Sequence, residues 1–179
     1  MIAPSRPWSV PVRLDEIPDT GLHLDLEADA GVRAAVATAA GVNEVPHLAA
    51  ALDVTRHGRD GLRVVGTVSS RVRQTCVVTL DPIENEIEEG VDLVFVSPSA
   101  LGPVAHEVNL GAEAIEPPEP LIDGVVDLGA VATEFFILGI DPYPRKPGAV
   151  FDPPIDADAG SHPFAALAAL RSGRDRSGS

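Results

Sequence analysis

The chain has 179 residues, of which 45% are hydrophobic, and its formal net charge is −14, with 27 acidic against 13 basic side chains. This length suits one domain with a hydrophobic core, and the 17 prolines and 16 glycines favour long irregular connections around it. Because binding to a phosphate backbone depends on Lys and Arg, the charge argues against a general nucleic-acid coat, and we expect no DNA partner.

The sequence shows no sign of a membrane span or of a disulfide framework. No stretch approaches the roughly eighteen consecutive apolar residues of a membrane helix, and no apolar run follows the positive charge near the N-terminus. A single cysteine, Cys76, excludes an internal disulfide and a zinc site made of several thiolates. We therefore expect a cytoplasmic protein without a cofactor.

The first forty residues predict two short strands and a helix. Four prolines among the first eighteen residues leave room for a short edge strand at Ser9–Arg13, docked by the preceding tryptophan. Alternating leucines predict a second strand over Leu22–Ala28. The alanine-rich stretch that follows predicts a helix over Asp29–Ala40, because Asp29 can accept hydrogen bonds from the first turn and Gly41 can adopt the left-handed conformation that ends a helix.

The middle of the chain alternates apolar and polar residues at the period of half-buried strands and predicts an antiparallel meander of three or four strands. After a break at Val45-Pro46, and with a hairpin loop over His57–Gly61, the expected strands are His47–Arg56, Leu62–Val72, Gln74–Leu80 and Ile83–Val96. Gly66 indicates either a bulge or a close approach of two backbones.

The last expected strand of this meander has one apolar and one acidic face. Its apolar row consists of Ile83, Ile87, Val91, Leu93 and Phe95. Its opposite face carries Glu84, Glu86, Glu88 and Asp92.

The C-terminal half predicts one good helix between irregular segments. Residues 97–120, rich in Pro, Gly, Ala and Glu, are typical of a mobile loop, and a short strand at Leu121–Ile122 follows. A helix capped by Asp127 is predicted by four apolar residues at helical spacing, Leu128, Val131, Phe135 and Leu138, and we expect the Phe135-Phe136 pair in the core.

Beyond this helix, three prolines between Asp141 and Gly148 require an extended path, and a terminal helix is expected over Phe164–Leu170 before a polar tail. The fold class is therefore α+β, an antiparallel sheet with a few short helices and long Pro/Gly-rich loops. We expect a single domain over 1–155, followed by a short helix and tail over 156–179.

Five of the 13 basic side chains fall within eighteen residues and form a candidate contact for RNA or a partner: Arg56, Arg59, Arg63, Arg71 and Arg73. The other interpretation is a solvated strand face on which arginines balance nearby carboxylates.

Other chemistry is weakly indicated. The five histidines are scattered without the spacing of a metal site, and no phosphate-cradling or nucleophile-elbow motif occurs. Cys76, among β-branched neighbours, is typical of a buried small apolar residue rather than a nucleophile. Glu84, Glu86 and Asp92 share a strand face and could hold a divalent ion in a hydrolase, although a solvated acidic face explains them as well.

Two segments resemble a known family. These are Cys76-Val77-Val78-Thr79-Leu80-Asp81-Pro82 and Asp141-Pro142-Tyr143-Pro144-Arg145-Lys146-Pro147-Gly148. With them the chain resembles the bacterial YceD family, also called DUF177 or large ribosomal RNA subunit accumulation protein, and most of all its alphaproteobacterial members. The resemblance extends from the early strands, through Gly66–Cys76, to the segment His162–Leu167.

The resemblance implies a role in the production or accumulation of 23S ribosomal RNA and no catalytic residues. Many members carry a second cysteine three residues after the first and another pair near the final prolines, which suggests zinc. In this chain Thr79 and the Pro144–Pro147 segment occupy those positions. We therefore hypothesise that the Cys76–Pro82 turn and the Asp141–Gly148 segment pack together without a metal.

The leading interpretation is a non-enzymatic factor in ribosome biogenesis that acts through a basic large-subunit ribosomal or processing protein, or through local contact with the 23S rRNA precursor. One alternative is a metal-dependent hydrolase or nuclease that uses the strand carboxylates. Another is an acidic protein-interaction adaptor without a ribosomal role.

Overall fold

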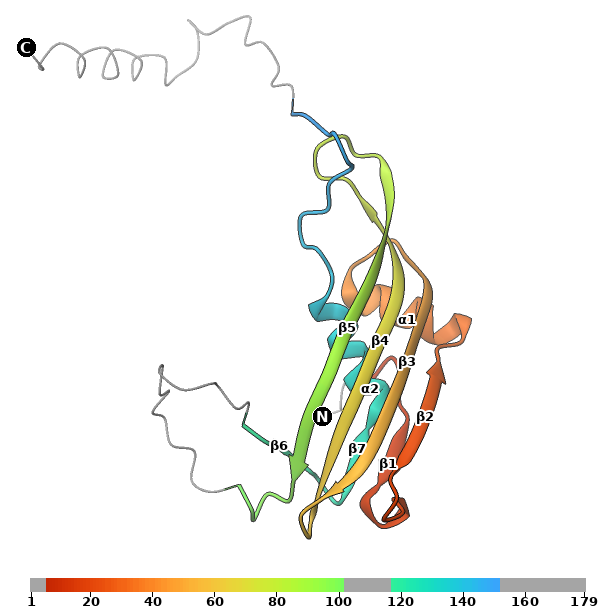
Figure 1. Cartoon of the computed structure of the whole chain (residues 1–179). Coiled ribbons are helices and arrows are strands. Elements are labelled where there is room, and N and C mark those ends of the chain that lie inside the picture. The colour runs from red at the N-terminus through yellow and green to blue at the C-terminus, as the bar shows by residue number, and fades with distance from the viewer. Residues whose placement is uncertain (1–5, 102–116, 152–179) are drawn as a thin grey trace, which may run out of the picture. The chain divides into compact units, whose positions relative to one another are not determined.

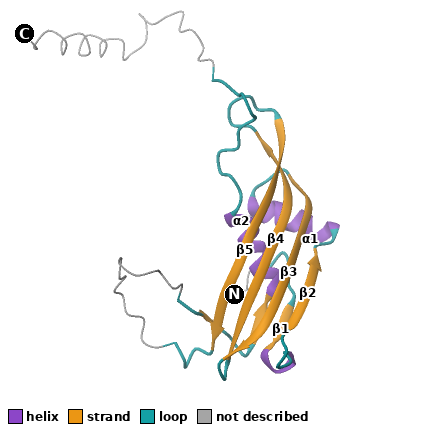
Figure 2. Ribbon diagram, viewed as in Figure 1, coloured by secondary structure: helices purple, strands orange, loops and turns teal. Residues whose placement is uncertain are grey.

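An antiparallel sheet with two helices on one of its faces forms the larger part of the fold in the computed structural model, which describes residues 6–101 and 117–151 (Figures 1 and 2). The chain divides into two units, Met1–Pro147 and Gly148–Ser179, and all described helices and strands lie in the first. The α+β prediction is confirmed.

The described residues of the first unit form ten elements: β1 (Pro11–Arg13), the 3-10 turn η1 (Leu14–Glu16), β2 (Leu22–Glu27), α1 (Ala30–Ala40), β3 (Glu44–His57), β4 (Gly61–Thr75), β5 (Pro82–Val96), β6 (Glu119–Pro120), β7 (Val125–Asp127) and α2 (Leu128–Leu138). The main sheet has the order β2-β3-β4-β5-β6, in which the first four strands are antiparallel neighbours and β6 pairs in parallel with the end of β5. The predicted meander is thus confirmed.

Three strand predictions are corrected. The break at Val45-Pro46 is a register shift inside β3, where the missing amide of Pro46 is tolerated. The strand predicted over Gln74–Leu80 does not exist: β4 runs on to Thr75, and the chain then turns back into β5. The strand expected at Leu121–Ile122 lies two residues earlier, as β6, which pairs with the end of β5.

Gly66 lies at a close approach of two backbones rather than at a bulge. The register between β3 and β4 runs without interruption past Gly66, which lies opposite Leu52. A Cβ atom at this position would overlap the carbonyl oxygen of Ala51, so the middle of the sheet requires a glycine here.

The helix boundaries follow the predicted capping residues. Asp29 accepts a hydrogen bond from the Val32 amide at 2.8 Å, and Gly41 ends α1 in the left-handed region. Asp127 accepts from the Ala130 amide at 3.2 Å and also from the Val10 amide at 2.8 Å, so this carboxylate joins the start of α2 to the N-terminal segment.

Both helices pack on the same face of the sheet, which we call the inner face (Figure 1). The core between the helices and the sheet contains, among others, Leu48, Val68, Val91 and Phe136. In α2, Leu128 and Val131 are buried and Leu138 is 71% exposed. The core position expected for the aromatic pair holds for Phe136, whereas Phe135 is only half-buried. Phe136 is the aromatic residue that the core encloses completely.

The N-terminal strand prediction is confirmed in shortened form. β1 pairs with β7 in a separate two-stranded sheet, and Trp8 is buried as expected.

Among the helices of the described residues, none has the length and apolar content that a bilayer crossing requires. The helix expected at Phe164–Leu170 and most of the loop expected over 97–120 lie outside the described residues. The boundary expected between residues 155 and 156 also lies beyond them and stays a prediction.

Candidate functional site

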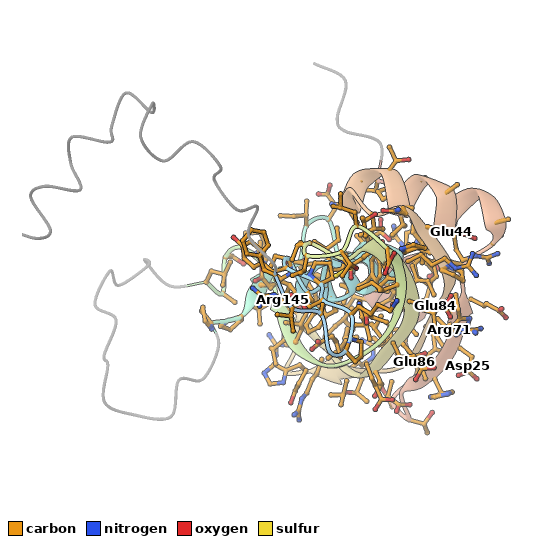
Figure 3. All side chains as sticks on the ribbon, turned by 90° about the horizontal axis from the view of Figure 1, so that it is seen from above. Asp25, Glu44, Arg71, Glu84, Glu86 and Arg145 are labelled. Carbon is orange, nitrogen blue, oxygen red and sulfur yellow. The ribbon has the colours of Figure 1, made fainter. Side chains whose placement is uncertain are left out.

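The outer face of the sheet, which points away from both helices, carries most of the acidic side chains of the central strands. Those on β2, β3 and β5 are Asp25, Glu27, Glu44, Asp53, Glu84, Glu86, Glu88 and Asp92. Between Asp25 and Glu27 on β2 and Glu88 on β5 the surface is a shallow hollow of about 560 Å³, floored by small residues such as Ala49 and Ser69. Figure 3 shows five labelled charged residues from this part of the sheet, Arg71 among the acids, on one side of the ribbon and Arg145 apart from them.

Three of the five candidate arginines are engaged by neighbouring groups. Arg63 makes two hydrogen bonds to Asp92, at 2.9 and 2.7 Å, which lower the pKa of that carboxyl. Arg73 lies between Glu44 and Glu84 and bonds to both. Arg56 donates to the carbonyl oxygen of Ile17 at 2.9 Å.

The remaining two candidates, Arg59 and Arg71, make no ion pair with any residue that the structure describes. Arg59 belongs to the β3–β4 turn, and Arg71 faces Glu86 across the β4–β5 ladder. The five arginines therefore do not gather into one basic patch, and most of their charge is balanced locally.

The three carboxylates of the hydrolase alternative share the outer face of β5 but do not converge. Glu84 and Asp92 are eight residues apart on one strand, about 26 Å at the usual rise. Both are paired with arginines, Arg73 and Arg63. Within residues 6–101 and 117–151, no group of three or more His, Cys, Asp or Glu side chains is arranged to hold a metal ion.

The turn between β4 and β5, which we call the tip, brings the two family-like segments together. The Val77 amide donates to the carbonyl oxygen of Pro144 at 2.9 Å, and the Lys146 side chain donates to Asp81 at 3.0 Å. Nearer the sheet, Gln74 donates to the carbonyl oxygen of Asp141 at 2.9 Å. The packing hypothesised from the sequence is present from Cys76 to Pro147; Gly148 belongs to the second unit.

The sulfur of Cys76 is the centre of the tip. This buried Sγ accepts hydrogen bonds from the amides of Lys146, at 3.3 Å, and Thr79, at 3.4 Å. Since both bonds favour the thiolate, they lower the pKa of Cys76 to about 6. Two backbone hydrogen bonds close the turn: the Cys76 amide donates to the carbonyl oxygen of Asp81, and the Leu80 amide donates to the carbonyl oxygen of Cys76. Leu80 has a positive φ of 60° in this turn.

The tip does not fit a zinc ion. A tetrahedral structural site needs four sulfur or imidazole ligands, whereas here one sulfur faces two amide hydrogens, and Thr79 directs its hydroxyl to Asp81. Amide donors, rather than a cation, stabilise this thiolate. Among the other motif side chains, Tyr143 and Arg145 are exposed to solvent, whereas Pro144 is buried.

Near the opposite end of β5, an apolar groove of about 640 Å³ lies between β5, the β6–β7 segment and α2. Leu93, Phe95, Val131 and Phe135 line its apolar walls, together with Leu138. The acids Glu119 and Glu134 lie at its lining, and Arg6 pairs with Asp127.

Sequence reasoning missed this groove. Leu138 and Ile122, which is 56% exposed, were assigned to a core helix and to a strand, yet both line the groove. The helical spacing of Leu138 was a real signal that this residue belongs to an apolar surface. Nothing in that spacing distinguishes a buried surface from an open one.

The comparisons with known proteins give one match. A family model described as large ribosomal RNA subunit accumulation protein YceD matches residues 64–171, which is more than half of the chain. The comparison with curated proteins and the comparison with solved structures each find no match.

Proposed function

The chain belongs to the YceD family, and we propose on that basis that it is a non-enzymatic factor in ribosome biogenesis that supports the accumulation of 23S ribosomal RNA. The observation that carries this proposal is the family match over 64–171, which spans β5, the tip and α2. Such a role places the protein in the cytoplasm, where the ribosomal subunits are assembled.

A protein partner agrees better with the surface than direct binding of RNA. Phosphate contacts need free cationic side chains, but Arg63 and Arg73 are already bonded to carboxylates. The acids around them, together with the net charge of −14, would repel RNA and attract a basic protein. A basic ribosomal or processing protein of the large subunit is therefore the partner that we propose.

Enzymatic action has no support from the arrangement of the described side chains. The carboxylates Glu84, Glu86 and Asp92 are spread along a strand, so they cannot act together on one metal ion. We therefore propose an assembly role without catalysis.

The test is the ratio of 23S to 16S rRNA, with precursor ends mapped, in cells depleted of the protein and then resupplied with it. We expect a selective fall in 23S that resupply reverses. An unchanged ratio would contradict the proposal and favour an acidic adaptor without a ribosomal role.

Direct RNA contact has its own test. In a gel shift with a 23S precursor fragment, the purified protein should bind weakly or not at all, and Arg71→Glu should change nothing. Tight binding that falls steeply with salt and is lost in Arg71→Glu would instead establish RNA as the partner.

A further inference from the structure

The long strand β5 has an open edge. β4 covers one side of β5 along its whole length, from Pro82 to Val96. On the other side β6 pairs with Phe95 and Val96 alone (Figure 1). Among the described residues, no further hydrogen bond reaches the backbone of β5 from this side.

One hydrogen bond shows which residues of β5 direct their backbone N–H and C=O groups toward this open edge. The Leu121 amide donates to the carbonyl oxygen of Val96, so the backbone groups of Val96 point away from β4. Because these directions alternate along a strand, and the β4–β5 register has no shift, the outward groups are those of the even-numbered residues. In the stretch nearest β6 these are Glu88, Gly90, Asp92 and Val94, and of their backbone groups only the Val94 carbonyl oxygen is already used by β6, because Glu119 lies opposite Phe95 in the parallel pairing.

Acidic side chains border this stretch. Glu88 lies on the outer face beside the edge, Glu89 on the inner face, and neither makes an ion pair with a residue that the structure describes. The edge of another copy of this chain would bring the same acids close together, which disfavours self-pairing. A strand with Lys or Arg at alternate positions would instead meet opposite charge.

The inner side of the same edge is apolar beyond Glu89, toward β6. The groove between β5 and α2 begins at Leu93 and Phe95, and its far wall is formed by Phe135 and the exposed Leu138. A strand added beside β5 would therefore have its inward side chains over this groove. Exposed apolar surface next to an unpaired strand edge is typical of a site for an extended peptide.

From these features we propose that the edge of β5 from Glu88 to Val94 binds an extended, basic segment of a partner protein by β-strand addition. Main-chain hydrogen bonds to the even-numbered residues hold the segment. Its outward Lys or Arg side chains meet Glu88, and its inward apolar side chains enter the groove. This inference deepens the proposed function, because it assigns where on this chain the basic partner docks.

The first test uses a defined peptide, eight residues of alternating Lys and Val, and amide hydrogen exchange on the full-length protein. In the free protein the four outward amides should exchange fast, because no described residue bonds to them, while the amides of Glu89, Val91 and Leu93, which face β4, are protected. The peptide should slow the four outward amides at least tenfold. A peptide of alternating Glu and Val should leave them unchanged.

Gly90 offers a matched pair of variants. A Cβ at this position meets nothing within 4 Å, so Gly90→Ala keeps both the space and the outward amide. Gly90→Pro removes that amide and places the ring where an added strand would lie, and proline is tolerated where the strand amide faces outward. We expect Gly90→Ala to bind the peptide like the wild type and Gly90→Pro to bind at least tenfold more weakly, with similar Tm.

Three results would overturn the inference. Equal binding of the peptide to Gly90→Pro, at an unchanged Tm, would place the site elsewhere. A second copy of the chain would be the occupant if two results came together. The outward amides would be protected in the wild type without peptide, and in Gly90→Pro that protection would disappear together with a dimer seen in sedimentation. Protection by an oligouridylate but not by the peptide would make RNA the occupant.

The peptide test and the rRNA test fail independently. A protein that binds the peptide while depletion leaves 23S unchanged keeps the edge as a binding site and refutes the ribosomal role. A selective loss of 23S without peptide binding keeps the role and refutes the edge.

Discussion

The two ends of β5 differ in how completely the chain covers itself. At the tip, the Asp141–Pro147 segment returns to the turn and supplies hydrogen bonds to Cys76, Val77 and Asp81. At the other end, beside β6, none of residues 6–101 and 117–151 fills the apolar groove or pairs with the strand edge beyond β6. The described hydrogen bonds of the tip are made within the chain, whereas at the groove end the described residues leave apolar surface and strand edge uncovered.

This difference separates stability from binding. Contacts at the tip should matter for the free energy of unfolding and little for partner binding. Contacts at the groove should matter for binding and little for stability. Helix α2 contributes to both properties, because one side of it packs on the sheet in the core and another forms a wall of the groove.

Two positions of α2 make this separation measurable. Phe136 is fully buried, so Phe136→Ala should lower the free energy of unfolding by about 3–5 kcal/mol through lost transfer energy and a cavity. Leu138, two residues on, is exposed and lines the groove, so Leu138→Ala should leave stability nearly unchanged but weaken binding of the Lys-Val peptide. Denaturant melts measure the stability of both variants, and peptide titrations measure their binding. A large loss of stability in Leu138→Ala would contradict an open groove.

At the tip, Cys76→Ala removes the sulfur that accepts two amides. The amides of Lys146 and Thr79 are then left without their acceptor. Leaving a buried polar group unsatisfied costs free energy of unfolding, and we expect that loss to lower Tm by about a few degrees. Cys76→Ser, whose oxygen can still accept, should have a Tm between those of the wild type and Cys76→Ala. Hydrogen exchange should show faster exchange at Lys146 and Thr79 alone, and unchanged exchange there would refute the role of the sulfur.

The same sulfur gives the tip a pH dependence. Folding lowers the pKa of Cys76 to about 6, below the ordinary thiol value, because the Lys146 and Thr79 amides stabilise the thiolate. The unfolded chain then binds more protons between about pH 6 and 8.5, so stability from this group is full above that window and is lost as pH falls through 6. The rise in Tm from about pH 6 to 8.5 should be larger in the wild type than in Cys76→Ala, and equal rises would contradict this.

The ion pair at the tip should matter least. Lys146 and Asp81 are both about half exposed, and pairs of this kind contribute little in water. Lys146→Met keeps the backbone amide that bonds to Cys76 and removes only the charge, so Tm should change by no more than a degree or so. A fall as large as that of Cys76→Ala would mean that the side chain, not the amide, closes the tip.

The sequence predicted those parts of the fold that local patterns determine. Alternation identified β5 with its apolar and acidic faces, and Asp29, Gly41 and Asp127 marked the helix boundaries. The end of β4 was predicted wrongly, because the β-branched residues around Cys76 favour a strand. The turn there depends on bonds to Pro144 and Lys146, almost seventy residues away, and local propensity contains no such information.

The candidate site was predictable only in part. The sequence showed that Glu84, Glu86 and Glu88 share a face, and it showed arginines nearby, but cross-strand pairing decides which charges are balanced. The open edge could not be predicted, since alternation gives the two faces of a strand and not its neighbours. Whether β6 covers two residues of β5 or the whole strand is a property of the folded sheet alone.

The most direct single measurement is the 23S-to-16S rRNA ratio in depleted cells resupplied with wild-type protein, Gly90→Ala or Gly90→Pro at equal levels. If the edge of β5 holds the partner through which the protein supports 23S rRNA, the wild type and Gly90→Ala restore 23S and Gly90→Pro, which blocks that edge, does not. Full restoration by Gly90→Pro would contradict this central claim.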